Sequence, residues 1–269
     1  MWVARYDIDS IDNRDPEVVA RWVDALEGPL RWYFRPTITG LDTIPPGPAL
    51  YVANHNAGLL TPDTFTFSIA VHRRLGIGAV PYGLAHEVAL AVPGIHELIV
   101  PLGAVRASHD AARRLFARGD KVLVYPGGDL DAWRSYRDRH RVVFGPRRGY
   151  VRLALREGVP IVPVVTDGAQ ATWFVLSDGR WLAKRIGVDR WLRMKAWPIV
   201  LSLPWGLTVG PPPPHIPFRT RIRQEILPPI TFDRTGEEAA ADADYVERCH
   251  RRVHGAMQAC LTRLAASKG

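Results

Sequence analysis

The sequence predicts an α/β fold in which a mostly parallel central sheet is flanked by helices. One observation is a set of short, continuous apolar runs, ALYVA at 49–53, KVLVY at 121–125 and VPIVPVV at 159–165, which are typical of strands buried on both faces. The second is that segments with helical periodicity lie between these runs, and strands that alternate with helices form parallel sheets. A length of 269 residues and a hydrophobic fraction of 47% suit a single domain over residues 1–269.

The first half of the chain should begin with a helix. An N-terminal helix is expected over about 15–35, because Asp15-Pro16 suits a helix start and apolar residues then repeat at helical spacing. Another helix should run from about 63 to 74. Residues 76–105 are interpreted as a strand, a short helix near 86–92 and another strand, with prolines marking the breaks.

The second half continues the alternation. Ser108 is a good N-cap for the helix HDAARRLFAR, and Gly119 suits the position after its end. A helix over 149–156 stops at a glycine before the strand VPIVPVV. TRIRQEI at 220–226 has the composition of a strand, and the last helix should run from about 242 to 264.

The net charge of +8 favours anionic partners such as phospholipid surfaces, phosphorylated ligands or nucleic acid. The chain has no RNA-binding signature, zinc-finger spacing or Lys/Arg block, so no nucleic-acid partner is expected. Its two cysteines, Cys249 and Cys260, fall in one predicted helix roughly 16 Å apart, too far for a disulfide within that helix. We therefore expect a reducing, cytoplasmic location, with no signal peptide and no membrane-spanning helix.

Residues 173–205 differ from the rest of the chain in their tryptophans and basic residues. Six basic residues and one acidic residue lie between Arg180 and Lys195. Tryptophan prefers the membrane interface, and basic side chains are attracted to anionic lipid. We expect this segment to face an anionic membrane surface, with WPIVLSLPW lying shallowly among the headgroups; the alternative is that the tryptophans pack in the core. Five of the nine tryptophans lie here: Trp173, Trp181, Trp191, Trp197 and Trp205.

Polar residues follow the predicted strands at three places. ALYVA runs into Asn54-His55, and Asp63 follows across an irregular loop. A later strand ends at Arg106, and KVLVY runs into the acidic, glycine-rich sequence at 126–131. Since the carboxyl ends of parallel strands gather at one edge of a sheet, we expect a general base, a cation and an acidic loop to share one cleft there.

These stretches resemble the sequence blocks of the glycerolipid (lysophospholipid) acyltransferase superfamily. Asn54-His55 with a downstream aspartate is similar to the first block, and LGAVR at 102–106 is similar to the second. VLVYPGGDLDAW at 122–133 resembles the third block in its YPGG form, found in relatives of the mono- and diacylglycerol acyltransferases. VPIVPV at 159–164 resembles the fourth, and the order and spacing of all four agree over about residues 40–165.

The resemblance implies an enzyme that moves a fatty acyl group from acyl-CoA or acyl carrier protein to a hydroxyl of a glycerolipid or lysophospholipid. It implies an acyltransferase-like fold, no cofactor besides the acyl donor, and peripheral association with the inner face of the membrane. His55 would be the general base, and Asp63 would fix its tautomer and stabilise the imidazolium. The residues expected to bind substrate are Asn54, Arg106, Tyr125, Pro126, Gly127, Gly128, Asp129 and Asp131.

Two positions depart from the family pattern. Seven residues separate His55 from Asp63, where the usual first block has four, so the loop at 56–62 must bulge for the side chains to reach hydrogen-bond distance. In the third block Gly127 replaces the common acidic residue, so that Asp129 or Asp131 is left to supply the carboxylate.

Arg106 is assigned to phosphate recognition, because a guanidinium fork suits phosphate oxygens. The alternative is a salt bridge to Asp129 or Asp131. Two other functions remain open for the chain as a whole. One is a lipid ester or thioester hydrolase that uses water with the same His–Asp pair, and the other is a non-catalytic phospholipid-surface protein.

Metal chemistry is not expected. His86-Glu87 and His96-Glu97 begin like zinc-protease motifs, but neither has a second histidine four residues after the first. Cys249, His250 and His254 have ligand-like spacing on one predicted helix. A structural zinc site usually needs four ligands, so these three are interpreted as a packed or solvated helix face.

Overall fold

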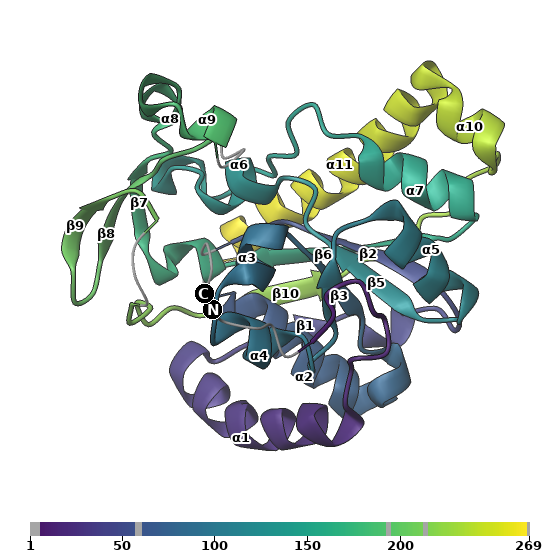
Figure 1. Cartoon of the computed structure of the whole chain (residues 1–269), viewed down its shortest axis with the longest axis horizontal. Coiled ribbons are helices and arrows are strands. Elements are labelled where there is room, and N and C mark those ends of the chain that lie inside the picture. The colour runs from purple at the N-terminus through teal and green to yellow at the C-terminus, as the bar shows by residue number, and fades with distance from the viewer. Residues whose placement is uncertain (1–5, 57–60, 192–194, 212–214, 268–269) are drawn as a thin grey trace.

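Figure 1 shows the computed structural model, which describes residues 6–56, 61–191, 195–211 and 215–267. Its main sheet contains β1 (Thr37–Thr39), β2 (Ala49–Ala53), β3 (Tyr82–Ala85), β4 (Ala104–Arg106), β5 (Lys121–Val124), β6 (Ile161–Asp167) and β10 (Arg223–Ile226). The spatial order is β1-β10-β6-β2-β5-β3-β4. The strands from β6 to β4 run parallel, whereas β10 is antiparallel to β6 and β1 is parallel to β10. The predicted α/β fold with a mostly parallel sheet is confirmed.

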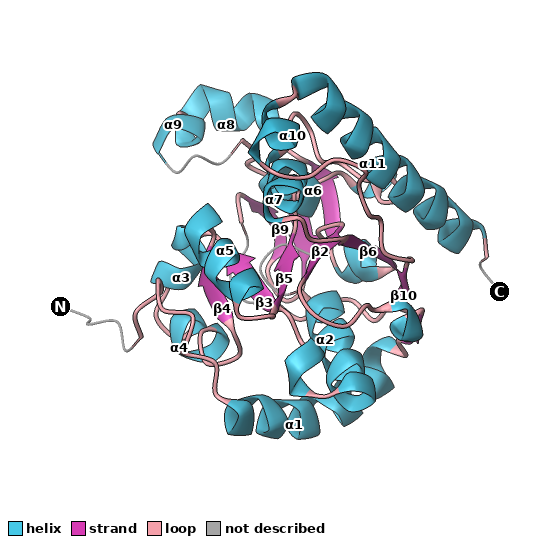
Figure 2. Cartoon of the chain, turned by 90° about the vertical axis from the view of Figure 1, so that its right-hand side faces the viewer, coloured by secondary structure: helices cyan, strands magenta, loops and turns pink. Residues whose placement is uncertain are grey.

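Helices cover both faces of this sheet (Figures 1 and 2). α1 (Pro16–Phe34) and α2 (Pro62–Leu75) lie on one side, and α5 (His109–Ala117), α7 (Gly149–Glu157) and α11 (Ala243–Ala266) lie on the other. Alternate residues of β2 serve the two cores: Leu50 and Val52 face α5, α7 and α11, while Tyr51 faces α2. This double burial explains why the strand is apolar at every position.

The helix boundaries agree with the caps read from the sequence. Asp15 accepts two backbone N–H bonds at the start of α1, and Ser108 accepts one at the start of α5. Residues 76–105 form one α-helix more than expected, because Pro93 and Gly94 separate two short helices from each other. The short helices of the main body are α3 (Glu87–Ala91), α4 (Ile95–Ile99), α6 (Gly128–Ala132) and α10 (Glu237–Ala241).

Residues 173–205 contribute to a second, three-stranded antiparallel sheet. It consists of β7 (Phe174–Ser177), β8 (Ile199–Ser202) and β9 (Gly206–Val209), in that order. The short helices α8 (Arg180–Ile186) and α9 (Val188–Trp191) lie between β7 and β8 in the chain. In Figure 1, β8 and β9 extend from the left side of the molecule.

The tryptophans of this segment take different environments. Trp173 is 1% exposed and packs in a cluster beneath β7 and β8, so the core alternative holds for it. Trp181 and Trp205 are 60% and 51% exposed, and Trp197 is half-buried. The side chain of Trp191 lies outside what the structure describes. Within the described ranges, no helix has both the length and the apolar character needed to cross a bilayer.

Candidate active site

The carboxyl end of β2 is tied to β6 through the side chain of Asn54. The Asn54 amide donates to the carbonyl of Thr166 (2.9 Å) and accepts from the N–H of the same residue (2.8 Å). These two side-chain hydrogen bonds continue the pairing of β2 with β6 beyond the end of β2. Asn54 is fully buried. Both ends of the amide are thus used within the protein, and the residue positions the end of β2. Substrate binding by Asn54 stays a prediction.

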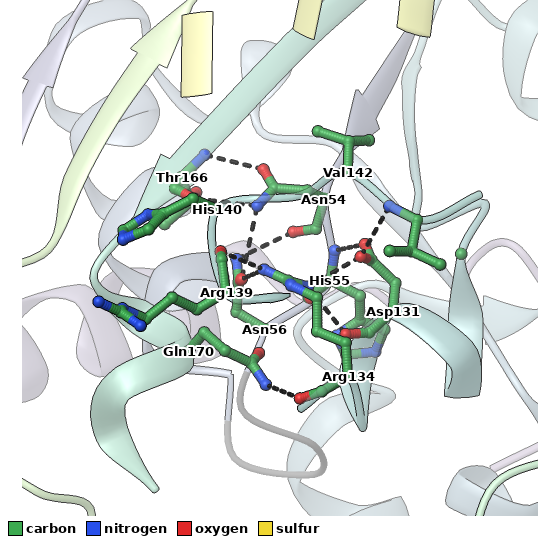
Figure 3. Close-up of polar contacts among 12 residues, drawn as sticks. Asn54, His55, Asn56, Asp131, Arg134, Arg139, His140, Val142, Thr166 and Gln170 are labelled. Atoms are coloured by element: carbon green, nitrogen blue, oxygen red, sulfur yellow. Dashed lines mark hydrogen bonds and ion pairs between the residues drawn. The ribbon is translucent and has the colours of Figure 1, made fainter. Parts of the chain in front are cut away.

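A buried ion pair holds the backbone of His55 on both sides. The His55 N–H donates to Oδ2 of Asp131 (2.6 Å), and the His55 carbonyl accepts from the guanidinium of Arg134 (2.6 Å). Asp131 and Arg134 pair at 2.8 Å, and their side chains are 0% and 3% exposed. Figure 3 shows both side chains converging on the histidine backbone. We call these two residues the His55 clamp; it fixes the backbone and leaves the imidazole outside the ion pair.

Gly127 makes room for the clamp. A Cβ at this position would lie 2.2 Å from Cβ of Asp131 and 2.4 Å from the carbonyl oxygen of Val143, so only glycine fits. Gly128 adopts φ 49° in the same turn, where Arg147 donates to the carbonyl of Gly127. Oδ1 of Asp131 also accepts from the N–H of Val143 (3.1 Å). Both carboxylate oxygens of Asp131 are thus bonded within the protein, and its contact with substrate stays a prediction.

Asp63 lies in the first turn of α2 and is 2% exposed. Its Oδ2 accepts from the Asn56 amide (3.0 Å), and Oδ1 of Asn56 accepts from Arg134 (2.6 Å). The predicted direct hydrogen bond between His55 and Asp63 is absent among the described residues, because Asn56 bonds the carboxylate instead. Within the part of the chain that the structure describes, Nδ1 of His55 and Oδ1 of Asp63 are each buried without a hydrogen-bond partner. Residues 57–60 of the loop expected to bulge are not part of the described structure.

Burial sets the charge state of both groups. Burial, together with the positive charge of Arg134, lowers the pKa of His55 to about 4. Burial raises the pKa of Asp63 to about 6, against the hydrogen bond from Asn56. At neutral pH the imidazole is therefore neutral and the carboxylate mostly ionised. These are the charge states that a general base and its supporting carboxylate require.

Tyr125 lies beside the imidazole. The centroid of its ring is 4.6 Å from that of His55, and its hydroxyl is 2.5 Å from Oγ1 of Thr64. Burial raises the pKa of Tyr125, so the phenol keeps its proton near neutral pH. The next residue, Pro126, offers its carbonyl to Arg147 (3.3 Å). Substrate binding by Tyr125 and Pro126 stays a prediction.

Asp129 is bonded away from the imidazole. One oxygen accepts from the guanidinium of Arg147 (2.6 Å), and the other accepts from the N–H of Lys195 (2.6 Å). The carboxylate thereby joins the glycine turn to the segment that leads into β8. Of the two candidate acids of the third block, Asp131 is the one that contacts the histidine backbone.

Arg106 does not contact the acidic loop, so the alternative of a salt bridge to Asp129 or Asp131 is wrong. Its partners are Asp9 and, at 2.9 Å, Glu87. The reason is topological: β4 is an edge strand, with β3 and β5 between it and β2, so the N-terminal segment reaches Arg106 first. Phosphate recognition by Arg106 stays a prediction.

Sequence reasoning missed two members of the site, Asn56 and Arg134. Arg134 follows Asp131 by three residues, which is the spacing of a helical ion pair, and that spacing is the one signal available. The sequence around Asn56 has no feature that would predict its hydrogen bond to Asp63, seven residues later. In the described part of the chain, no three His, Cys, Asp or Glu side chains group in a way that could hold a metal ion.

Comparison with known proteins finds similarity to acyltransferases. The sequence model of the Acyltransferase family matches residues 35–167. The chain is 33% identical over 213 residues to an uncharacterized protein of Mycobacterium tuberculosis, covering 79% of this chain and 56% of that protein. It is 22% identical over 233 residues to diacylglycerol O-acyltransferase 2 of Homo sapiens, covering 73% of this chain and 56% of that protein. It thus spans about half the length of these curated relatives.

A solved structure shares the fold. The crystal structure of the 1-acyl-sn-glycerophosphate acyltransferase PlsC from Thermotoga maritima superimposes with a TM-score of 0.58 at 18% sequence identity. The match covers 95% of this chain and 85% of the other. At this identity the similarity establishes the arrangement of sheet and helices and leaves the substrate to be argued from the site.

Proposed function

Because the chain belongs to the glycerolipid acyltransferase superfamily, we propose that it transfers a fatty acyl group from acyl-CoA or acyl carrier protein to a hydroxyl of a glycerolipid or lysophospholipid. The His55 clamp is the observation that carries this proposal. It holds a neutral imidazole at the carboxyl end of β2, and a hydrogen-bonded path through Asn56 links the clamp to a buried carboxylate. His55 and Asp63 each keep one buried polar atom that makes no hydrogen bond within the described residues, which leaves both atoms available for chemistry.

His55 is the general base in the proposed reaction. The acceptor hydroxyl gives its proton to the imidazole as its oxygen attacks the thioester carbonyl, and a C–O bond forms. The tetrahedral oxyanion then collapses, the C–S bond breaks, and the leaving thiolate takes the proton back from the imidazolium. The proton and the acyl group are both conserved in this exchange, and no covalent bond to the protein is needed.

The low pKa of His55 calls for a second element in the mechanism. A base with a pKa of about 4 is weak near neutral pH. We therefore include in the proposal that Nδ1 of His55 pairs with the free Oδ1 of Asp63 when substrate is bound. A carboxylate beside the ring raises the pKa of the imidazole and stabilises the imidazolium as it forms.

A basic cavity next to the clamp is the proposed position for a substrate phosphate. It has a volume of about 260 Å³, and its lining includes Arg139, Arg221 and Arg223. Asp167 also lines the cavity and accepts a hydrogen bond from Arg223 (2.7 Å). The positive charges of Arg139 and Arg221 are therefore left without a carboxylate in the lining to balance them. The clamp adjoins this cavity, because Arg134 donates to the carbonyl of Arg139 (3.3 Å). An excess of arginine suits phosphate oxygens.

We also propose that the protein works peripherally at the inner, cytoplasmic face of a membrane. A long acyl chain is poorly soluble in water, so an enzyme that uses it gains from contact with lipid. The charge of +8 supports attraction to an anionic surface, and the free, buried state of Cys249 and Cys260 suits a reducing compartment.

The central test is a transfer assay with labelled acyl-CoA. The purified protein is given a lysophospholipid, a diacylglycerol or no acceptor, and the labelled products are separated. Acyl transfer should produce labelled lipid that depends on the acceptor. Release of labelled fatty acid with no need for an acceptor would identify the hydrolase alternative, and no turnover with any acceptor would remove the enzymatic proposal.

The phosphate position has its own test. Arg221→Gln should raise KM for a phosphate-bearing acceptor by about tenfold, because one charge-assisted contact is lost. It should leave KM for an uncharged acceptor unchanged. Arg106→Lys tests the alternative position at the edge of the sheet. An effect of Arg106→Lys without an effect of Arg221→Gln would move the phosphate site to Arg106.

A further inference from the structure

We propose, building on the peripheral membrane association above, that the outer face of the small sheet docks into an anionic bilayer. The docking face consists of five side chains on β7, β8 and β9: Phe174, Leu176, Leu201, Leu207 and Val209. In Figure 1, β8 and β9 extend from the left side of the molecule, while β7 lies next to the main body.

An antiparallel sheet at the surface usually has one apolar face, packed on the core, and one polar face in solvent. In the small sheet the face in solvent is apolar as well. Phe174 pairs with Leu201, and Leu201 pairs with Leu207, so the three side chains form a row across the sheet. Their exposed fractions are 37%, 43% and 63%. On the opposite face Val175 and Val200 are fully buried against the main body. The sheet is therefore apolar on both faces, and one of them faces solvent.

The exposed apolar surface extends past the strands. Leu203 and Trp205, in the turn between β8 and β9, are 47% and 51% exposed. Ile216, which pairs with Leu203, is 58% exposed. Of the 13 exposed large hydrophobic side chains in the described ranges, ten fall between residues 174 and 216. Such a concentration marks an interaction surface, because isolated exposed hydrophobic residues would be scattered.

Charge and tryptophan content identify the occupant as lipid. α8 begins shortly after β7 and carries the exposed residues Trp181 and Ile186 together with exposed Lys184 and Arg185, with no acidic residue in the helix. A second copy of this chain would bring the same positive charge toward the face, which opposes self-association. Anionic headgroups attract it, and exposed tryptophan is favoured at the headgroup level. An anionic bilayer satisfies both the apolar and the basic parts of the surface.

The experiment is vesicle flotation without acyl donor. Wild-type protein is mixed with vesicles of phosphatidylcholine alone or of equimolar phosphatidylcholine and phosphatidylglycerol, at low and high salt. Binding should need the anionic lipid and weaken with salt. The double variant Trp205→Ser/Leu207→Ser should lose about tenfold or more in apparent affinity, since two apolar side chains no longer leave water. The matched control is Trp32→Ser/Leu75→Ser, which removes a tryptophan and a leucine that are 68% and 41% exposed on α1 and α2.

The basic part of the surface is tested in the same assay. Lys184→Glu/Arg185→Glu should weaken binding to anionic vesicles by about tenfold or more. Arg251→Glu/Arg252→Glu on α11 makes the same change in net charge on exposed residues elsewhere and should have a smaller effect. Equal losses in both pairs would show that net charge alone drives binding and would overturn the assignment of this surface.

Two further results would overturn the proposal. One is wild-type protein that ignores anionic vesicles. The other is a dimer, seen by light scattering, that Trp205→Ser/Leu207→Ser converts to a monomer, which would assign the face to a second copy. Acyl transfer is measured separately with a micellar acceptor. His55-dependent transfer without vesicle binding would sink the docking face alone, and vesicle binding without transfer would sink the enzymatic proposal alone.

Discussion

Replacing Asp63 by asparagine should stabilise the protein near neutral pH and lower acyl transfer. Burial raises the pKa of this carboxyl from an ordinary 3.8 to about 6. Because the folded state binds this proton more tightly than the unfolded chain does, the protonated carboxyl adds to the free energy of unfolding. This contribution is fully present below pH 3.8 and is lost as the pH rises through about 6. At about 1.4 kcal/mol per pKa unit, the buried carboxylate costs ~3 kcal/mol of folding free energy above that window. Asparagine removes the titration and keeps an oxygen that can accept from Asn56.

Urea unfolding of both proteins from about pH 4 to about pH 8 measures this cost. The unfolding free energy of Asp63→Asn, relative to wild type, should rise with pH by about 2–3 kcal/mol. The pKa of His55 is lowered to about 4, so the stability that the neutral imidazole contributes is lost as the pH falls toward that value. Both proteins contain His55, so this contribution cancels in the difference between their unfolding free energies. Transfer should fall by about 10²-fold or more. A stability difference that does not change with pH would refute the burial argument.

Three other substitutions test the site. His55→Ala should lower transfer by about 10²–10⁴-fold with a small change in unfolding free energy, because only the general base is removed; a variant with more than a tenth of wild-type activity would contradict this role. Asp131→Asn should cost about 3–5 kcal/mol in urea unfolding, because Arg134 is left buried without its counter-charge, and a cost below about 1 kcal/mol would contradict the clamp. Gly127→Ala should fail to give stable protein, whereas Gly149→Ala, which has open space around its Cβ, should fold normally; melting temperatures compare the two.

The main sheet could be predicted because a strand buried on both faces appears in the sequence as a continuous apolar run. β2 has no polar position, and neither core that it serves tolerates one. The small sheet could not be predicted in this way. Its strands are four residues long, and the outward positions of β7 and β8 are as apolar as the inward ones. Neither a period of two nor a continuous run of useful length distinguishes such strands from an irregular apolar segment.

The site was predictable where chemistry follows a strand end and unpredictable where it depends on partners. His55 comes directly after a buried strand, and its place at the carboxyl edge follows from the parallel sheet. The bond from its N–H to Asp131 joins residues 76 apart in sequence, and Arg106 meets Asp9 across 97 residues. Such pairs depend on which distant segments the fold brings together. The type of a residue alone does not identify its partner. The expectation that the strand ends share one cleft therefore suggested the wrong carboxylates for Arg106.

The His55 clamp and the docking face are mechanically joined by one short segment. Residues 131 and 134 point toward the histidine, while Ala132 and Trp133 between them pack with Val175 and Val200 beneath the small sheet. A small sheet seated in the headgroups would therefore hold the clamp near the lipid surface. His55 would then be within reach of an acceptor whose acyl chain stays in the bilayer. Residues 131–134 thus join the backbone of His55 to the core of the small sheet.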